Sequence, residues 1–216
     1  MIFMIRFFFI LIFLSACNAF PLYTFTAVAA KNSILGYEDI EITNDTLVNI
    51  PYAFIRAKIG KGPGVIMVLA KEDKGVMQWI SADDVNLFTY HGKIIRTLGL
   101  ANDIEIINYI KAPELSDQIV NSNEVSYLAN FMNPALYEFN ILTQLEPMGT
   151  MQTLQTIYGK KNVLVYKEVF EVKSLGWKGK NTYFISEGGA LEQTTQEIHP
   201  FLPPIKIEFI RKYQKS

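Results

Sequence analysis

The sequence predicts an all-β protein with one antiparallel domain, whose strands follow one another as a meander and form a barrel-like or sandwich arrangement. Two observations predict this fold. Apolar and polar residues alternate in short runs over most of the chain, and residues that favour turns, mainly Gly, Asn and Asp, separate these runs. Sequences typical of long helices are almost absent after residue 36, so successive hairpins are the expected connections. The pattern leaves the choice between barrel and sandwich open.

The first sixteen residues have the layout of a secretory signal peptide. Arg6 is followed by an apolar run over 7–14, and the small residues Ser15 and Ala16 come directly before Cys17. This run of about 8 residues is much shorter than the roughly 20 that a membrane-spanning helix needs. We therefore expect residues 1–16 to be an export signal that is removed.

The segment Leu14-Ser15-Ala16-Cys17 resembles the bacterial lipobox, in which the cysteine becomes the first mature residue and carries acyl chains such as palmitate. Several chains make a durable anchor, since each buried CH₂ contributes about 0.8 kcal/mol. Cys17 is the only cysteine of the chain, which favours lipidation over the alternative of an incidental buried cysteine. In the bacterial lipoproteins that this segment resembles, an Asp directly after the lipidated cysteine favours retention in the inner membrane. This chain has Asn18 at that position. We therefore expect a lipid anchor in the outer membrane, on its periplasmic face.

Residues 17–36 are expected to form a lipidated tether and a short helix. The Ala-rich piece 27–30 favours a helix, and Gly36 would end it. The β domain is expected over 37–216. Its first strands are predicted at 37–43, 51–59, 65–70, 76–80, 85–90, 93–98 and 104–110, with a turn at 44–45.

The stretch 112–133 is rich in Asn, Ser and Pro, and we expect it to be a connection and the only internal boundary of the domain. After it the alternation resumes, and a turn rich in Gly, Lys and Asn is predicted at 159–162. Strands are predicted at 135–144, 151–158, 163–172, 181–186, 190–197 and 205–213.

The composition argues against several functions. With 20 Lys and Arg against 21 Asp and Glu, the chain has a formal net charge of −1 and lacks the basic surplus typical of nucleic-acid binding. His91 and His199 are the only histidines, so a metal centre of clustered ligands is not expected. No Gly-x-Ser-x-Gly motif is present. We expect no catalytic residues, no metal and no cofactor.

A polysaccharide hydrolase is a weaker alternative. Cleavage of a glycosidic bond needs two carboxylates that face each other. Asp83 and Asp84 are adjacent and would point to opposite faces of a strand. Substitution of Asp83 and Glu105 would test this alternative.

Four residues are candidates for a binding or structural role: Arg96, Trp79, Asp83 and Tyr183. If their hairpins are neighbours, the Arg96 guanidinium could stack on Trp79 or bind a sugar carboxylate. The preferred interpretation is an ion pair that joins the hairpins, for example with Asp83. Trp79 and Tyr183 could be stacking platforms for a saccharide, although core positions are favoured, whereas Trp177 is expected in an exposed turn.

Five segments together carry a family resemblance, by their order and spacing: Ile50–Ala53, Val68–Ala70, Trp79–Asp83, Thr89–Leu100 and Asn181–Phe184. They resemble the YjbF/GfcB family, and the resemblance extends over about 37–213. Its most specific part is His91–Leu100, in which Lys93 stands where the family generally has Arg. In the segment Asn181–Phe184, Phe184 stands where the family commonly has Trp.

Members of this family are lipoproteins of the group 4 capsule and exopolysaccharide operons. The resemblance implies a periplasmic lipoprotein, anchored in the outer membrane, that assists export or assembly of a surface polysaccharide without catalysing a reaction. Its expected partners are the membrane, other proteins of an export apparatus and the polysaccharide itself. A different possibility, a lipid or lipoprotein carrier, requires a large apolar cavity within the curved sheet.

Overall fold

The protein is represented by a computed structural model that describes residues 39–108 and 124–213. The described strands lie in one compact unit, formed by residues 39–60 and 64–216. The expected signal peptide, Cys17 and the tether with its helix lie outside the described residues. Among the described residues, no helix has the length and apolarity required to cross a membrane.

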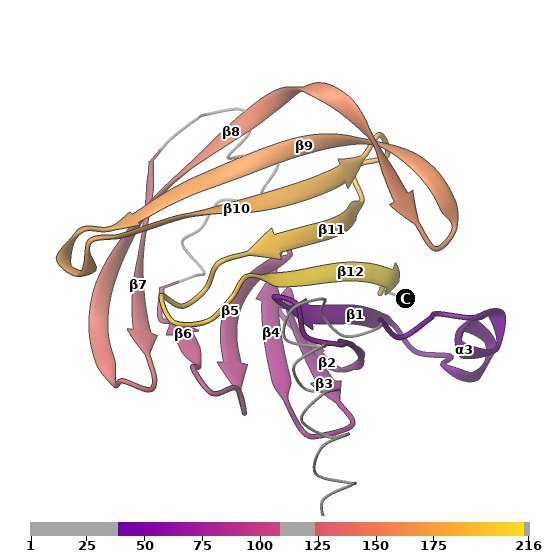
Figure 1. Ribbon diagram of the computed structural model, residues 1–216, viewed down its shortest axis with the longest axis horizontal. Coiled ribbons are helices and arrows are strands. Elements are labelled where there is room, and N and C mark those ends of the chain that lie inside the picture. The colour runs from indigo at the N-terminus through magenta and orange to yellow at the C-terminus, as the bar shows by residue number, and fades with distance from the viewer. Residues whose placement is uncertain (1–38, 109–123, 214–216) are drawn as a thin grey trace, which may run out of the picture. The chain divides into compact units, whose positions relative to one another are not determined.

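Twelve strands form a closed antiparallel barrel in which each strand pairs with its neighbours in sequence (Figure 1). Closure comes from the first and last strands, which pair from Ile55 opposite Phe209 to Ile59 opposite Ile205. The all-β meander is thereby confirmed, and the arrangement left open by the sequence is a barrel. The strands are β1 Phe54–Ile59, β2 Gly64–Asp73, β3 Val76–Ser81, β4 Asn86–Tyr90, β5 Lys93–Leu98, β6 Ile104–Ile106, β7 Val125–Phe131, β8 Leu136–Thr156, β9 Gly159–Val172, β10 Trp177–Ser186, β11 Leu191–Gln196 and β12 Ile205–Arg211.

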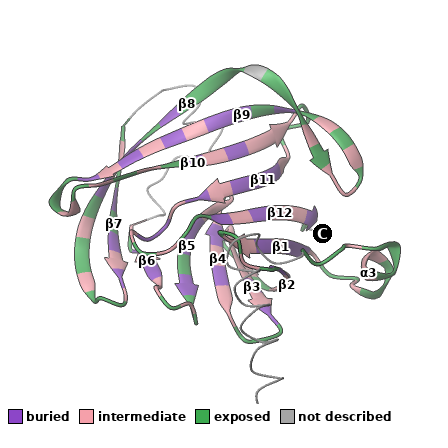
Figure 2. Cartoon of the chain, viewed as in Figure 1, coloured by how far each residue is buried: buried purple, intermediate pink, exposed green. Residues whose placement is uncertain are grey.

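Apolar side chains fill the interior of the barrel, and along each strand they alternate with side chains that face outward. Along β7, Tyr127, Ala129 and Phe131 are buried while the residues between them are partly or fully exposed. The same alternation appears as purple bands on most strands in Figure 2. Because successive side chains of a strand point to opposite faces, each strand contributes every second residue to the core. Trp79 and Ile207 are among the most deeply buried of these residues.

One end of the barrel is covered by the connection between β11 and β12. In this connection the ring of His199 lies 5.3 Å from that of Phe131, which belongs to β7 on the opposite wall. Ile198 is buried and Leu202 packs against the same core. We call this the closed end. At the other end, which we call the mouth, lie the tight turns around Gly75, Gly92 and Gly189.

The segment before the barrel differs from the prediction. Residues 39–43 form no strand, and the predicted turn is part of a short helix, α3 Asn44–Asn49. Thr43 is its N-cap: its hydroxyl accepts a hydrogen bond from the Thr46 amide, and the Thr46 hydroxyl accepts one from the Thr43 amide. This capping box satisfies amides that a strand would have paired with a neighbour.

The predicted connection 112–133 is also wrong in its second part, because Val125–Phe131 forms β7. Its polar residues face outward and bind the next strand, as Asn130 shows by accepting a hydrogen bond from the Glu138 amide. The predicted break at 145–150 is absent too. β8 continues through it with a bulge between Pro147 and Met151, and Gly149 supplies a positive φ of 75°.

β9 and β10 begin earlier than predicted. Gly159, expected in a turn, is the first residue of β9 and pairs with Thr156. Trp177, expected in an exposed turn, is the first residue of β10. Its ring packs edge-on against Phe131 and Phe170, at 5.8 and 4.8 Å between centroids. This packing explains why the strand extends to the tryptophan.

Candidate functional site

Two of the predicted residues, Trp79 and Tyr183, belong to the interior of the barrel. Trp79 is 1% exposed, its indole N–H donates to the Thr89 hydroxyl at 3.0 Å, and its ring packs edge-on against Phe209. Tyr183 is equally buried. A stacking platform needs a ring face that a ligand can cover, and with 1% of each residue exposed these two rings are too buried for that, so both pack in the core.

Arg96 and Asp83 do not form the ion pair that the sequence suggested. Arg96 is exposed on β5 and lies opposite Glu105 of β6, with 3.6 Å between its Nε and the Glu105 Oε1. Its guanidinium lies 5.6 Å from the centre of the Phe88 ring. Asp83 instead accepts a hydrogen bond from the Ser81 hydroxyl in the turn after β3. The expected pairing with Asp83 is therefore wrong, and the four residues do not assemble into one site.

A polar group that the sequence did not reveal lies inside the barrel. Glu168 of β9 forms an ion pair with Lys93 of β5 and accepts hydrogen bonds from the Asn181 amide at 2.7 Å and the Tyr183 hydroxyl at 2.9 Å. The Lys93 ammonium also lies 4.4 Å from the centre of the Tyr127 ring. We call Lys93, Glu168, Asn181 and Tyr183 the interior cluster.

The interior cluster holds a charged carboxylate. Burial alone would raise the pKa of Glu168, but the charge of Lys93 and the hydrogen bonds from Lys93, Asn181 and Tyr183 outweigh it and keep the pKa below its ordinary value. Burial and the neighbouring carboxylate raise the pKa of Tyr183 well above its ordinary value. Glu168 therefore stays ionised and Tyr183 stays protonated at neutral pH, so the cluster is a satisfied structural network.

The mouth opens into a cavity of about 730 Å³. Its walls are mainly apolar and include Trp79, Tyr166 and Phe209, and its rim includes Lys212 and Tyr213. Deeper inside, beside Lys93, the free space shrinks to about 20 Å³. The open part of the interior is thus confined to the mouth, and the core fills the remainder.

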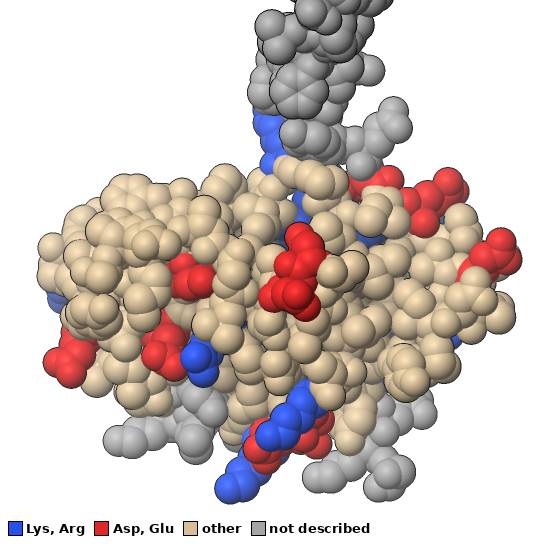
Figure 3. Space-filling model, turned by 90° about the horizontal axis from the view of Figure 1, so that it is seen from below, with Lys and Arg blue, Asp and Glu red and all other residues tan. Residues whose placement is uncertain are grey.

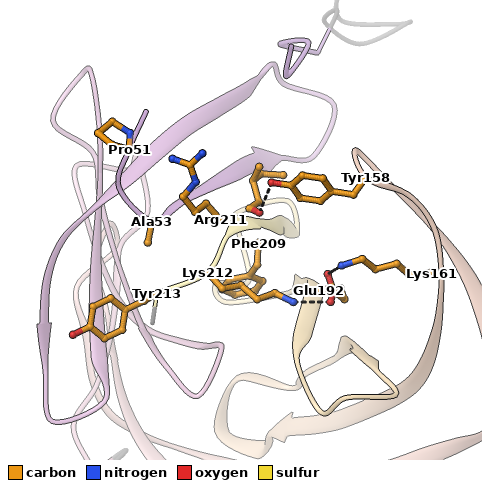
Figure 4. A pocket seen from close by; sticks show the side chains of 10 residues that line it. Pro51, Ala53, Tyr158, Lys161, Glu192, Phe209, Arg211, Lys212 and Tyr213 are labelled. Carbon is orange, nitrogen blue, oxygen red and sulfur yellow. Dashed lines mark hydrogen bonds and ion pairs between the residues drawn. The ribbon is translucent and has the colours of Figure 1, made fainter. Parts of the chain in front are cut away.

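A second concavity of about 600 Å³ adjoins this cavity and shares Phe209, Lys212 and Tyr213 with it (Figure 4). We call it the lysine groove. Glu192 of β11 lies between two lysines, with its Oε2 2.9 Å from the Lys161 Nζ and its Oε1 2.6 Å from the Lys212 Nζ. The groove is lined by Pro51, Ala53, Tyr158, Lys161, Glu192, Phe209, Ile210, Arg211, Lys212 and Tyr213.

The lysine groove carries more positive than negative charge. The Glu192 side chain is 5% exposed, whereas those of Lys161 and Lys212 are 36% and 35% exposed. Arg211 adds a third cation, whose guanidinium donates to the backbone carbonyls of Leu47 and Ile50. Carbonyl groups satisfy its N–H donors without neutralising its charge. Three cations therefore meet one carboxylate in this groove.

Glu192 is ionised as well. Burial would raise its pKa, but the hydrogen bonds and charges of Lys212 and Lys161 outweigh burial and hold the pKa below its ordinary value. Among the described residues, no group of three or more His, Cys, Asp and Glu side chains is placed to bind a metal. The groove is thus a donor-rich surface suited to an anion.

The face of the molecule shown in Figure 3 offers a contrast to the groove, because its charges are dispersed. On the face shown in Figure 3, acidic and basic side chains lie singly or in small groups among uncharged residues, without a continuous basic surface. Several of the charged residues of the barrel are paired, as Arg56 is with Glu208. The lysine groove therefore differs from this face by gathering cations in one concavity.

Comparison with known proteins identifies related sequences over most of the chain. The family model of the Group 4 capsule polysaccharide lipoprotein gfcB, YjbF matches residues 27–210. The uncharacterized lipoprotein YjbF of Escherichia coli (strain K12) is 25% identical over 182 residues, which cover 83% of this chain and 85% of that protein. The uncharacterized lipoprotein GfcB of the same organism is 21% identical over 186 residues, which cover 84% and 86%.

A solved structure supports the fold. The crystal structure of the hypothetical lipoprotein YmcC from Escherichia coli (K12) superposes with a TM-score of 0.69 at 18% identity. The superposition covers 89% of this chain and 96% of that one. At this identity the likeness extends to the fold alone.

Proposed function

Because this chain belongs to the Group 4 capsule polysaccharide lipoprotein family, we propose that it is an outer-membrane lipoprotein, exposed to the periplasm, that assists export or assembly of a capsular polysaccharide or exopolysaccharide. The observation that carries this proposal is the family match over residues 27–210. The related YjbF and GfcB proteins are lipoproteins, which supports a lipid anchor, with Cys17 as the acylated residue. Other proteins of the export apparatus and the polymer are the proposed partners.

We further propose that the protein works by binding and not by catalysis. The buried carboxylate of the barrel, Glu168, is occupied by Lys93, Asn181 and Tyr183, and this saturation suits a structural role. A general acid or base needs a proton that it can exchange with a substrate, in a position that the substrate reaches. Glu168 meets neither condition. This supports a protein that acts by binding other molecules at its surface.

Deletion of the gene tests the proposed function. We expect the deletion strain to carry less surface polysaccharide while it continues to make the polymer precursors. Expression of the intact chain from a plasmid should restore the surface polymer. A deletion strain with a normal amount of surface polysaccharide would contradict the proposal.

Metabolic labelling with a palmitate analogue tests the anchor. The intact chain should take up the label and sediment with membranes, and Cys17→Ser should do neither. The chain has no second cysteine, so the double variant Cys17→Ser, Ser216→Cys is a suitable control. It restores a thiol at a position without a lipobox and should stay unlabelled. Label on Cys17→Ser would refute the assignment.

The mouth cavity favours a second candidate function, that of an acyl-chain carrier. The cavity is bounded by Met77, Leu164, Ile185 and Leu191 in addition to Trp79. A brominated fatty acid bound there should quench Trp79, which lines the cavity, and spare Trp177 at the closed end. Trp177→Phe should then retain the quenching and Trp79→Phe should lose it. Absence of saturable quenching would reject this candidate.

A further inference from the structure

We propose that the lysine groove binds a carboxylate-bearing sugar of an acidic polysaccharide, with the sugar carboxylate held between Lys161 and Lys212. The inference rests on the proposed function, because that function makes a polysaccharide the ligand to consider. The groove adds the chemical class, an acidic sugar such as a uronic acid, and the place where it binds.

The first argument is charge. Lys161, Lys212 and Arg211 line the groove together with the single carboxylate of Glu192, so the groove has a surplus of two positive charges. An anionic ligand is drawn to such a surplus, and a concave site strengthens the attraction because it excludes part of the solvent. A neutral sugar would gain nothing from this surplus of positive charge.

The second argument is the position of the donors. Lys161 lies on β9, two strands from β11, and Lys212 directly follows β12, and both ammonium groups converge on Glu192 of β11 (Figure 4). Each ammonium has three N–H donors and gives one to Glu192. Both side chains remain about one-third exposed, so the other donors can reach a ligand.

Glu192 has a definite part in this arrangement. By binding both lysines it fixes the positions of two long side chains that would otherwise be free to move in solvent. Such preorganisation lowers the entropy loss when a ligand binds. At the same time the negative charge of Glu192 competes with that of the ligand for the two lysines, so the ligand binds less tightly. Weaker binding makes the groove suitable for a polymer that must be released.

The third argument is the aromatic lining. Tyr158 and Tyr213 lie on different sides of the groove and are 55% and 38% exposed (Figure 4). The Tyr158 hydroxyl donates to the Ile210 carbonyl at 3.2 Å, which fixes the position of its ring. An exposed aromatic ring with a fixed position offers a flat apolar surface to the C–H face of a sugar ring. The volume of about 600 Å³ is within the range of ligand sites.

A binding measurement tests the inference. The full chain, purified in detergent, is titrated with oligogalacturonate of about six sugars, an oligomer that carries one carboxylate per sugar, and maltohexaose serves as the neutral control. We expect saturable binding of oligogalacturonate that weakens as salt is added, because ammonium groups supply the attraction. Maltohexaose should bind at least about tenfold more weakly. Equal binding of the two oligomers, or no binding of oligogalacturonate, would overturn the inference.

Variants locate the site. Lys161→Gln and Lys212→Gln should each weaken oligogalacturonate binding by about tenfold, the usual effect of losing one charge-assisted contact. In each single variant the other lysine still pairs with Glu192, which protects the fold. Glu192→Gln should strengthen binding several-fold, because it removes the competing charge while its amide oxygen can still accept a hydrogen bond from a lysine and help to hold it in place. Lys178→Gln, which removes an exposed lysine paired with Glu171 on β9, is the control and should bind like the unmodified chain. Unchanged binding in both lysine variants would overturn the inference.

The outcome separates this inference from the proposed function. If deletion of the gene lowers surface polysaccharide but the lysine variants bind oligogalacturonate normally, the function stands and the groove is not the site. If the variants lose binding but deletion leaves the surface polymer unchanged, the groove binds acidic sugars and the proposed function is wrong.

Discussion

Lysine and glutamate meet in the interior cluster and in the lysine groove, and the two arrangements differ in stoichiometry and burial. Inside the barrel one lysine meets one glutamate, and the neutral donors Asn181 and Tyr183 complete the shell of the carboxylate. In the groove two lysines share one glutamate, and both remain partly exposed. The first arrangement leaves no room for a ligand, because the free space beside Lys93 is only about 20 Å³. The second keeps unused donors at the surface, and we attribute structure to one and binding to the other.

The largest expected effect comes from removing the interior cation. Lys93→Met leaves Glu168 charged and buried without a counter-ion, and we expect the free energy of unfolding to fall by about 3–5 kcal/mol. Urea denaturation measures this change in the free energy of unfolding. The control, Lys178→Met, removes a lysine from an exposed pair and should change stability by less than about 0.5 kcal/mol. Equal losses in the two variants would break the distinction between buried and exposed pairs.

The dependence of stability on pH sharpens the same comparison. In the unmodified chain the pKa of Glu168 is lowered, so the cluster adds stability above the ordinary carboxyl pKa and loses it as pH falls through the folded value. In Lys93→Met burial is opposed by hydrogen bonds only, and we expect the pKa to be raised. That variant should therefore gain stability relative to the unmodified chain as pH falls. Parallel pH profiles would contradict the charge state assigned to Glu168.

A smaller loss is expected in the groove. The double variant Lys161→Gln, Lys212→Gln removes both cations from Glu192, but this carboxylate lies beside an open groove and can be hydrated. We expect the free energy of unfolding to fall by about 1–2 kcal/mol, in the range for an acceptor left without its donors. Thermal unfolding monitored by circular dichroism measures it. A loss as large as that of Lys93→Met would mean that the groove is as structural as the interior.

The smallest effect should follow Tyr183→Phe, which removes one neutral donor from Glu168 and retains the ring. We expect a loss of about 1 kcal/mol, because Lys93 and Asn181 still bind the carboxylate. Oligogalacturonate binding should be unchanged. If this variant loses binding while it remains folded, the interior cluster and the groove are coupled, and our separation of them is wrong.

Much of the barrel could be predicted because its turns are local. The β4–β5 turn at His91 and Gly92, with φ values of 49° and 83°, depends on residues that tolerate this conformation, and the sequence shows them directly. The capping box of Thr43 and Thr46 is equally local, although a short alternating pattern obscured it. β7 was missed because its outward Ser126 and Asn130 resemble residues of a loop until their partners on β8 are known.

The site was harder to predict because its residues are distant in sequence. Glu168 and Lys93 are 75 positions apart, and Glu192 and Lys161 are 31 apart. The only local signal was a glutamate at an inward position between Tyr166 and Phe170 on β9. Which cation it meets depends on how the sheet closes, and alternation along a strand carries no information about the opposite wall of a barrel.

Complementation of the deletion strain tests the central claim most directly, since it measures surface polysaccharide at matched protein levels. We expect Tyr183→Phe to restore the polymer to the level of the unmodified chain, and Lys161→Gln, Lys212→Gln to restore markedly less while still reaching the membrane. Full restoration by the double lysine variant, together with failure of Tyr183→Phe, would place the function in the interior of the barrel and contradict our account.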